Sequence, residues 1–307
     1  MPAPLKTNVE RLLRISVEVQ PVHPAQPAIY RVGPDGSVHV GPGVGGITLN
    51  LKVGDPALGW VADHAEPCVT TRNTDNGRNS GVAFLACIGN LATVISGDAK
   101  GDQGVVTGKH GGVEHTMIDF ADDTLAKLAY GDTIRIDAYG QGLALLDAGD
   151  IIPMNLDPGL LTHPKWGVKL SRGRMTVPVA HVVPAKLMGS GLGRDNSRGG
   201  DYDIQLFDPA LVEEHGLASL RLGDIVAITD ADHSFGRIYR TGAVSISVIT
   251  HGACTTAGHG PGATTLLTSA TGAIVPVCDA KANLADILGV GRERRARRKP
   301  RRPSGKK

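Results

Sequence analysis

The sequence is short of aromatic residues, cysteines and long apolar runs. Aromatic residues make up only 4% of its 307 positions, too few for a stacking platform that binds single-stranded nucleic acid. The longest apolar run, residues 82–88, is far shorter than the roughly 20 residues of a membrane-spanning helix. The four cysteines lie far apart without a Cys-x-x-Cys pair, as is typical of reduced thiols. No apolar segment near the start resembles a secretion signal, so we expect a cytoplasmic protein that does not bind membranes.

Turn-forming residues are abundant by contrast. Glycine (41 residues) and proline (19) separate short apolar segments, and 41% of the chain is hydrophobic, enough for a buried core. Many segments alternate apolar and polar residues as half-buried strands do, most clearly residues 15–19, 47–53 and 133–137. The segments with helical spacing after an acidic start are residues 122–129 and 208–220, with 282–288 as a third candidate. The pattern predicts a mostly β protein with a few short helices.

Two stretches of the chain are similar to each other. Residues 111–142 and 199–236 each run from Gly-Gly through a strand, a phenylalanine beside an acid and a short helix to Gly-Asp and a second strand. Such a repeat implies two related β-barrel or sandwich-like units, although common turn sequences could produce the same likeness. We place these units at residues 1–155 and 156–290. Exposed strand edges commonly close by association, so we expect a homo-oligomer.

Positive charge is concentrated at the end of the chain. Residues 292–307 contain ten basic residues and one acidic residue, a net charge of +9, whereas the whole chain carries +2. The rest of the chain is therefore acidic, with a net charge of −7. Like charges without apolar residues repel each other, so residues 291–307 are predicted to be a disordered basic tail. The tail could bind nucleic acid without sequence preference, or be only a solubilising extension.

Acidic residues and a histidine gather where one predicted strand ends. Asp230 and Asp232 lie on the same face of that strand, and His233 follows them. Two carboxylates and an imidazole can hold Zn²⁺, Mn²⁺ or Mg²⁺ and leave positions for water. The alternative is an Asx turn, in which the carboxylates accept hydrogen bonds from nearby backbone N–H groups.

A second group surrounds the Gly-Gly turn of the first repeat. His110, in a loop, is the better ligand of this group, whereas His115 could be an ordinary half-buried histidine of a strand. The equivalent segment of the second repeat supplies Asp203. We therefore predict a site for a divalent metal (Zn, Mn or Mg) built from some of Asp230, Asp232, His233, His110 and Asp203.

Glycine-rich loops predict further functional residues but no nucleotide cofactor. Gly189, Ser190 and Gly191 belong to a loop whose backbone N–H groups could hold an anion, with Lys109 as a basic partner. Residues 104–110 are one residue short of a P-loop and lack Ser or Thr after the lysine. The loop at 189–193 lacks the spacing of a dinucleotide fingerprint.

Several strings of residues closely resemble one family. They are GVGGITLNLKVGDPALGW, ACIGN, SGDAKGDQGVVTGKHGGVEH, AYGQG, MGSGLG, GDYDIQLFD, DADHSFGR and HGPG. The strings lie between about residue 42 and residue 268 and resemble the bacterial and archaeal family called domain of unknown function 4438. The resemblance implies a mostly β fold of several units and no particular activity.

A fainter similarity concerns residues 199–203 and 230–233. Their rhythm is similar to that of acetamidases and formamidases, in which a Gly-Gly-Asn-Met-Asp turn precedes a Gly-Asp-x-His metal segment. Asp203 and His233 match the Asp and His of that pattern, whereas its Gln-Gly-x-Gly-Glu continuation is absent here.

These observations lead to one main functional hypothesis and two alternatives. The main hypothesis is a metal-dependent hydrolase for a small polar amide or lactam, in which His259, between glycines in an exposed loop, or Glu114 transfers protons. The first alternative is a non-catalytic oligomeric β protein that binds a metabolite or anion at residues 189–200. The second is association with nucleic acid through residues 292–307.

Overall fold

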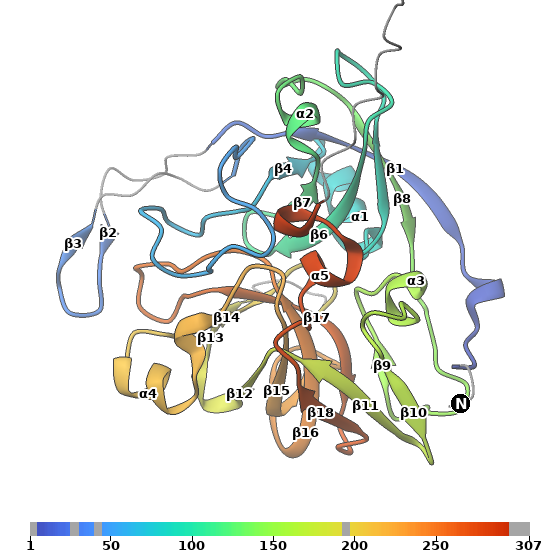
Figure 1. Ribbon diagram of the computed structural model, residues 1–307, viewed down its shortest axis with the longest axis vertical. Helices are drawn as coiled ribbons and strands as arrows, with labels where there is room; N and C mark the ends of the chain where they lie inside the picture. The colour runs from blue at the N-terminus through green and yellow to red at the C-terminus, as the bar shows by residue number, and fades with distance from the viewer. Residues whose placement is uncertain (1–4, 25–30, 40–44, 192–196, 295–307) are drawn as a thin grey trace, which may run out of the picture.

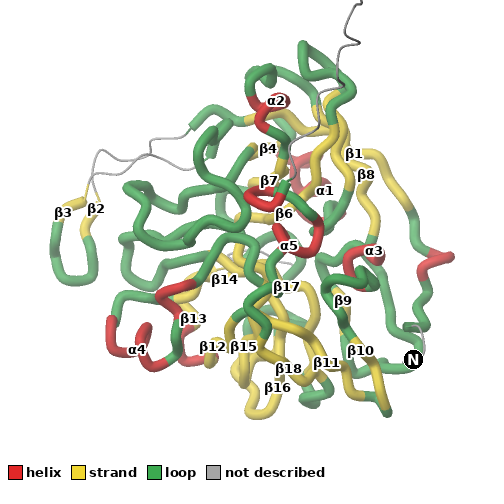
Figure 2. The backbone as a smooth tube through the Cα atoms, in the orientation of Figure 1, coloured by secondary structure: helices red, strands yellow, loops and turns green. Residues whose placement is uncertain are grey.

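Strands dominate the computed structural model, which describes residues 5–24, 31–39, 45–191 and 197–294. Figure 1 shows two bodies of strands, one formed by each half of the chain, packed against each other. The helices are short segments between strands and loops (Figure 2), and the longest, α1 (Asn76–Leu85), has ten residues. None of the described helices has the length and apolar character needed to cross a membrane. The predicted mostly β fold is confirmed.

Six strands of the first half close into a barrel, in the order β1, β4, β7, β6, β5, β8. Their bounds are β1 (Arg14–Pro21), β4 (Val69–Arg72), β5 (Leu91–Val94), β6 (Gln103–His110), β7 (His115–Asp119) and β8 (Ile134–Tyr139). Side chains alternate between the inside and outside of the barrel: Ile134 and Ile136 are buried, and Arg135 between them is exposed. In β8 the apolar residues of the alternating sequence pattern are therefore those that point into the barrel.

The second half forms a larger and a smaller sheet. The larger has the order β12, β15, β16, β17, β14, β13, with β9 paired to β17, and the smaller has the order β10, β11, β18. Their bounds are β9 (Ile152–Pro153), β10 (Lys169–Ser171), β11 (Arg174–Val179), β12 (His181–Pro184), β13 (Met188–Gly191), β14 (Tyr202–Ile204), β15 (Ile225–Asp232), β16 (Ile238–Ile249), β17 (Gly262–Ser269) and β18 (Ile274–Cys278). β17 is buried along its whole length, and the Thr264 hydroxyl donates to the carbonyl of Lys109 in β6. The barrel and the larger sheet thus pack directly on each other.

The remaining elements are small. They are the hairpin β2 (Arg31–Val32) and β3 (Val38–His39), the helices α2 (Asp122–Leu125), α3 (Pro158–Leu161), α4 (Pro209–Glu214) and α5 (Leu284–Leu288), and 3-10 turns at Val9–Arg11, Ala185–Leu187, Leu217–Ser219 and Gly291–Glu293. The helix expected over 208–220 is divided, because Gly216 adopts a left-handed φ of 62° after α4.

The two repeat-like segments share a local architecture. Each consists of a strand, a short helix and a strand, namely β7–α2–β8 and β14–α4–β15. In both sheets a hairpin lies between those two strands, β5–β6 in the barrel and β16–β17 in the larger sheet. Along the chain, the hairpin β5–β6 precedes β7–α2–β8 in the first half, whereas the hairpin β16–β17 follows β14–α4–β15 in the second.

Residues 47–53, expected to be a strand, form a loop instead. Only an isolated bridge joins Ile47 to Val69. Leu51 and Val53 are buried, but Leu49 is 66% exposed. Burial therefore follows the alternating pattern over only part of the segment, and the segment ends in turns instead of pairing along a sheet.

The last described residues return to the barrel. Arg292 donates two hydrogen bonds to the Asp55 carboxylate, at 2.5 and 2.6 Å, and Arg294 pairs with Asp119. Residues 291–294 of the predicted tail are therefore bound to the folded body. Residues 295–307 lie outside the described residues.

Candidate metal centre

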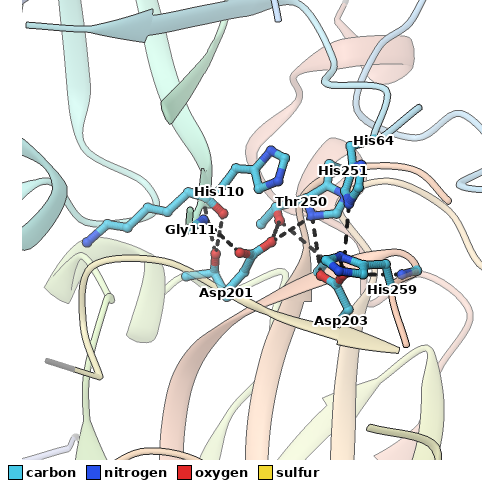
Figure 3. Close-up of polar contacts among 12 residues, drawn as sticks. His64, His110, Gly111, Asp201, Asp203, Thr250, His251 and His259 are labelled. Carbon is cyan, nitrogen blue, oxygen red and sulfur yellow. Dashed lines mark hydrogen bonds and ion pairs between the residues drawn. The ribbon is translucent and has the colours of Figure 1, made fainter. Parts of the chain in front are cut away.

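Histidines and carboxylates from distant segments meet where the barrel faces the larger sheet (Figure 3), and the Cys254 thiol lies near two of the histidines. We call these nine residues the interface cluster. Its members are His64 and Glu66 before β4, His110 and His115 at the ends of β6 and β7, Asp201 and Asp203 at β14, and His251, Cys254 and His259 between β16 and β17. The cluster divides into three groups of three, within each of which the ligand atoms lie within 4.8 Å of one another.

The first group is Asp201, Asp203 and His251, all buried. Nε2 of His251 lies 2.8 Å from Oδ2 of Asp201 and 3.6 Å from Oδ1 of Asp203. Nδ1 of His251 is 2.9 Å from the carbonyl oxygen of Gly252 and donates to it, which directs Nε2 toward the carboxylates. Nε2 nevertheless has no aligned hydrogen-bond partner among the described residues. Carboxylate oxygens and imidazole nitrogens that converge in this way are of the types that can bind a divalent cation.

The charges of this group depend on one another. Burial favours neutral His251, but the two carboxylates outweigh burial and raise the pKa of His251 to about 9. Burial also opposes ionisation of Asp201, yet His251 lowers the pKa of that carboxyl. Burial raises the pKa of Asp203, as does the charge of Asp201, although His251 acts in the opposite direction. A proton on His251 therefore balances the acids, and a divalent cation can replace that proton.

Glycines allow the close approach of these side chains. A Cβ atom at Gly262 would collide with Oδ2 of Asp201 and with Nε2 of His251. Backbone N–H groups orient the carboxylates: that of Gly111 donates to Oδ1 of Asp201 at 2.8 Å, and that of Gly260 donates to Oδ2 of Asp203 at 3.2 Å. The glycine-rich loops thus serve the geometry of the site.

The second group is Glu66 with His110 and His115. The ionised Glu66 accepts from Nδ1 of His110 at 2.5 Å and from Nδ1 of His115 at 3.0 Å, and the Thr70 hydroxyl donates to its other oxygen at 2.5 Å. Burial works against ionisation, but the two histidines hold the pKa of Glu66 well below its usual range. Burial, aided by the charge of His251, lowers the pKa of His110, which is therefore neutral. A carboxylate at Nδ1 fixes the tautomer and leaves the Nε2 lone pair available.

The third group is His64, Cys254 and His259. Nδ1 of His259 lies 3.1 Å from Oδ2 of Asp203, and Nε2 of His64 lies 4.0 Å from the same oxygen. The backbone N–H of His64 donates to the carbonyl of Ala253 at 3.1 Å, which holds the two loops together. The side chain of His259 is 37% exposed, whereas that of His64 is 11% exposed. His259 therefore marks the open side of the interface cluster.

The predicted ligands on β15 take no part in any of these groups. Among the described residues, Asp230, Asp232 and His233 belong to none of the three sets of potential metal ligands. Asp232 accepts from the backbone N–H of Ser234 at 3.0 Å and from its hydroxyl at 2.6 Å, which is the Asx-turn alternative. It also pairs with Arg240 at 3.1 Å.

The neighbours of Asp232 are likewise engaged locally. Asp230 sits at a β-bulge with φ 57°, and its carboxylate accepts from the backbone N–H of Gly242 at 2.7 Å. His233 is buried, with Nδ1 2.7 Å from the Thr265 hydroxyl. The structure therefore gives these residues turn and packing roles.

The other predicted site residues are divided. His110, Asp203 and His259 lie in the interface cluster, whereas Glu114 occupies the adjacent turn with φ 61°. Lys109 is fully buried, and its Nζ donates to Oδ1 of Asn155 at 2.8 Å and to the carbonyl of Arg198 at 2.9 Å. Burial lowers the pKa of Lys109 to about 8. This lysine joins the barrel to the second half.

The predicted anion loop, residues 189–191, lies at the edge of the interface cluster, in contact with the loop that carries His259. Gly189, Ser190 and Gly191 form β13. The backbone N–H of Ser190 donates to the carbonyl of Gly258 at 2.5 Å, so this N–H group already has a partner. The contact places β13 beside the loop that carries His259. The next residues, 192–196, lie outside the described residues.

Comparison with known proteins assigns the family. Two family models match the chain, domain of unknown function (DUF4438), N-terminal, at residues 30–162, and domain of unknown function (DUF4438), C-terminal, at residues 165–288. The chain belongs to the DUF4438 family. A solved structure titled "Crystal structure of TM1086" is similar, with 47% sequence identity over 92% of this chain and 98% of that chain and a TM-score of 0.87. No curated protein matches the chain.

Both DUF4438 domains contribute to the interface cluster. His64, Glu66, His110 and His115 lie in the part matched by the N-terminal model, and the other five residues lie in the part matched by the C-terminal model. Six members of the interface cluster were not among the predicted site residues: His64, Glu66, His115, Asp201, His251 and Cys254. One signal was present: Asp201 and Asp203 are two residues apart in an extended segment, so both can face one side.

Proposed function

We propose that this chain is a metal-dependent hydrolase for a small polar amide or lactam, with a divalent cation (Zn²⁺, Mn²⁺ or Mg²⁺) bound by Asp201, Asp203 and His251. The observation that carries the proposal is Nε2 of His251, which is buried beside two carboxylates without an aligned hydrogen bond. Buried charges are costly unless a counter-charge or a metal compensates them. A cation between these three side chains would supply that compensation in place of the proton on His251.

A cation at this position would polarise a carbonyl group and lower the pKa of a water molecule. We assign to His110 the role of accepting the proton of that water, because Glu66 holds its Nδ1–H at 2.5 Å and the imidazole is neutral. The centroid of its ring is 4.1 Å from that of His251. An imidazole oriented by a carboxylate is the usual arrangement of a general base. This geometry favours His110 over His259 and Glu114 for the proton transfer.

Two features support a small amide as the substrate. The interface cluster is mostly buried and opens beside His259, so a large substrate has little room. The Gly-Gly-Asp-Tyr-Asp segment, in which Asp203 matches the Asp of the pattern, is similar to the corresponding turn of acetamidases and formamidases. Small polar amides and lactams are therefore the first compounds to screen.

Elemental analysis of the full chain, purified without a His tag or chelator, tests the proposal. We expect at least about one equivalent of Zn, Mn or Mg, lost on chelation together with hydrolysis of any amide found in the screen. The variant Glu66→Gln should retain the metal and lose about 100-fold or more in turnover, because His110 loses its orienting carboxylate. A chain that binds none of these metals, as purified or after addition of metal salts, would contradict the proposal.

A further inference from the structure

The two carboxylate oxygens of Asp203 face different groups of the interface cluster. Oδ1 lies 3.6 Å from Nε2 of His251, on the side shared with Asp201. Oδ2 lies 3.1 Å from Nδ1 of His259 and 4.0 Å from Nε2 of His64 (Figure 3). A carboxylate placed between two sets of ligands can bridge two metal ions, which lie about 3.5–4 Å apart in two-metal sites.

The group on the Oδ2 side has the composition of a metal site of its own. His64, Cys254 and His259 offer two imidazoles and a sulfur atom, all within 4.8 Å of one another. Backbone hydrogen bonds hold this group together: His64 donates to Ala253, and Gly252 donates to Ala65 at 2.9 Å. Nitrogen and sulfur ligands favour Zn²⁺ over Mg²⁺ or Mn²⁺.

The Glu66 group does not offer an equivalent position. Both oxygens of Glu66 already accept aligned hydrogen bonds, from His110 and Thr70 at 2.5 Å and from His115 at 3.0 Å. By contrast, the contacts of His259 and His64 with Asp203 are ion pairs that lack the alignment of a hydrogen bond. Oδ2 of Asp203 accepts one aligned hydrogen bond, from the backbone N–H of Gly260 at 3.2 Å, and its contacts with the two histidines leave it able to bind a cation.

We propose that the chain binds a second divalent cation at His64, Cys254 and His259, and that Asp203 bridges it to the first. The proposal rests on the proposed function for the first cation at Asp201 and His251. The two positions differ in chemistry, since the first is rich in oxygen and the second in nitrogen and sulfur. Two ions at this distance hold the attacking water and the carbonyl oxygen of a substrate at the same time.

Titration of the metal-free full chain with Co²⁺ tests the second position. A thiolate bound to Co²⁺ absorbs in the near ultraviolet, whereas oxygen and imidazole ligands do not give this band. We expect about two equivalents to bind and the thiolate band to follow one of them. Cys254→Ser should abolish the band and weaken one equivalent at least about tenfold. Cys278→Ser, at an exposed cysteine outside the cluster, is the matched control and should change neither.

The outcomes separate the two proposals. Binding of about one equivalent without a thiolate band, lost in Asp201→Asn, overturns the second cation and leaves the proposed function standing. Absence of all binding overturns both. A band that survives Cys254→Ser and disappears in Cys278→Ser also overturns the second cation. If Cys254→Ser does not fold, His259→Asn, at the most exposed ligand, should weaken the equivalent that carries the band and leave the other unchanged.

Discussion

Two acid-and-histidine segments of this protein differ in how their polar atoms are satisfied. At residues 230–233, each carboxylate accepts hydrogen bonds from the backbone of its own hairpin, and Asp232 also pairs with Arg240. In the interface cluster, Asp201 and Asp203 accept from the backbone of other segments and also face His251. Nε2 of His251 and Nε2 of His233 are both buried without an aligned partner among the described residues, but of the two histidines His251 alone belongs to a group of potential metal ligands there. The comparison shows that local density of ligand residues does not make a metal site. The interface cluster differs in that its potential ligands converge from separate segments of the chain.

The largest expected effect is on metal binding and distinguishes Asp201 from Asp232. Asp201→Asn removes a charged ligand from the first group and should weaken metal binding by more than about 100-fold, a larger loss than that of an outer-shell partner. Asp232→Asn should leave the metal content unchanged, because Asp232 is engaged with Ser234 and Arg240. Isothermal titration with Zn²⁺ and Mn²⁺ measures both, with thermal melting as the control for folding. Equal losses in the two variants would invalidate the comparison.

A glycine tests the geometry of the cluster without removing a ligand. Gly262→Ala places a methyl group against Asp201 and His251 and should weaken metal binding by about 10- to 100-fold. The backbone of Gly262 is not left-handed, so alanine is not strained there. Gly149→Ala, which meets nothing within 4 Å, is the control and should bind metal as the parent does. Undiminished affinity in Gly262→Ala would show that the ligands are less tightly arranged than the structure places them.

The contributions of His233 and His251 to the free energy of unfolding should change with pH in opposite directions. Burial lowers the pKa of His233 to about 3, against about 6.5 in the unfolded chain. Its contribution to stability is complete above pH 6.5 and is lost as the pH falls toward 3, with about 2 kcal/mol lost by pH 5. The pKa of His251 is raised to about 9 instead. In metal-free protein its contribution is therefore complete below about pH 6.5 and is lost as the pH rises through 9.

Urea denaturation of metal-free protein at pH 5, 7 and 9 measures both contributions. His233→Gln should flatten the change between pH 7 and 5, and His251→Gln should flatten the change between pH 7 and 9. The reverse assignment would mean that His233, not His251, carries the proton.

The smallest effect on stability is expected at Arg240, which pairs with Asp232 of the segment 230–233. Arg240 is half-exposed, and its ion pair with Asp232 is therefore screened by solvent. Arg240→Ala should lower the free energy of unfolding by less than about 1 kcal/mol and leave the metal content unchanged. Chemical denaturation of the variant and the parent in parallel is sufficient. A loss of bound metal here would link the two segments, contrary to the geometry.

Much of the fold could be read from the sequence, because strand formation follows from local alternation. β1 and β8 lie where residues 15–19 and 133–137 alternate, and in β8 the inward side chains are the apolar ones, whereas in β1 Val19 is buried and Ile15 is exposed. The strand predicted at residues 47–53 is wrong, because the alternation covers only part of a loop that tertiary contacts hold in place. β17 and α1 were not predicted. β17 is buried on both faces and has no polar alternation, and α1 is rich in polar and glycine residues.

For the candidate site, the amino-acid sequence by itself determined the ligand types, the Gly-Gly turns that carry several of them, and three members of the interface cluster, His110, Asp203 and His259. Only the tertiary structure decided which ligands meet. His251 comes from the C-terminal half and lies against the ring of His110 from the barrel, 4.1 Å between centroids. Asp232, although adjacent to other ligand residues in the chain, is engaged by Ser234 within its own hairpin, and Nδ1 of His233 lies 2.7 Å from the Thr265 hydroxyl of β17. The physical reason is that turn hydrogen bonds depend on neighbours in sequence, whereas a metal site depends on side chains that folding brings together and leaves unsatisfied.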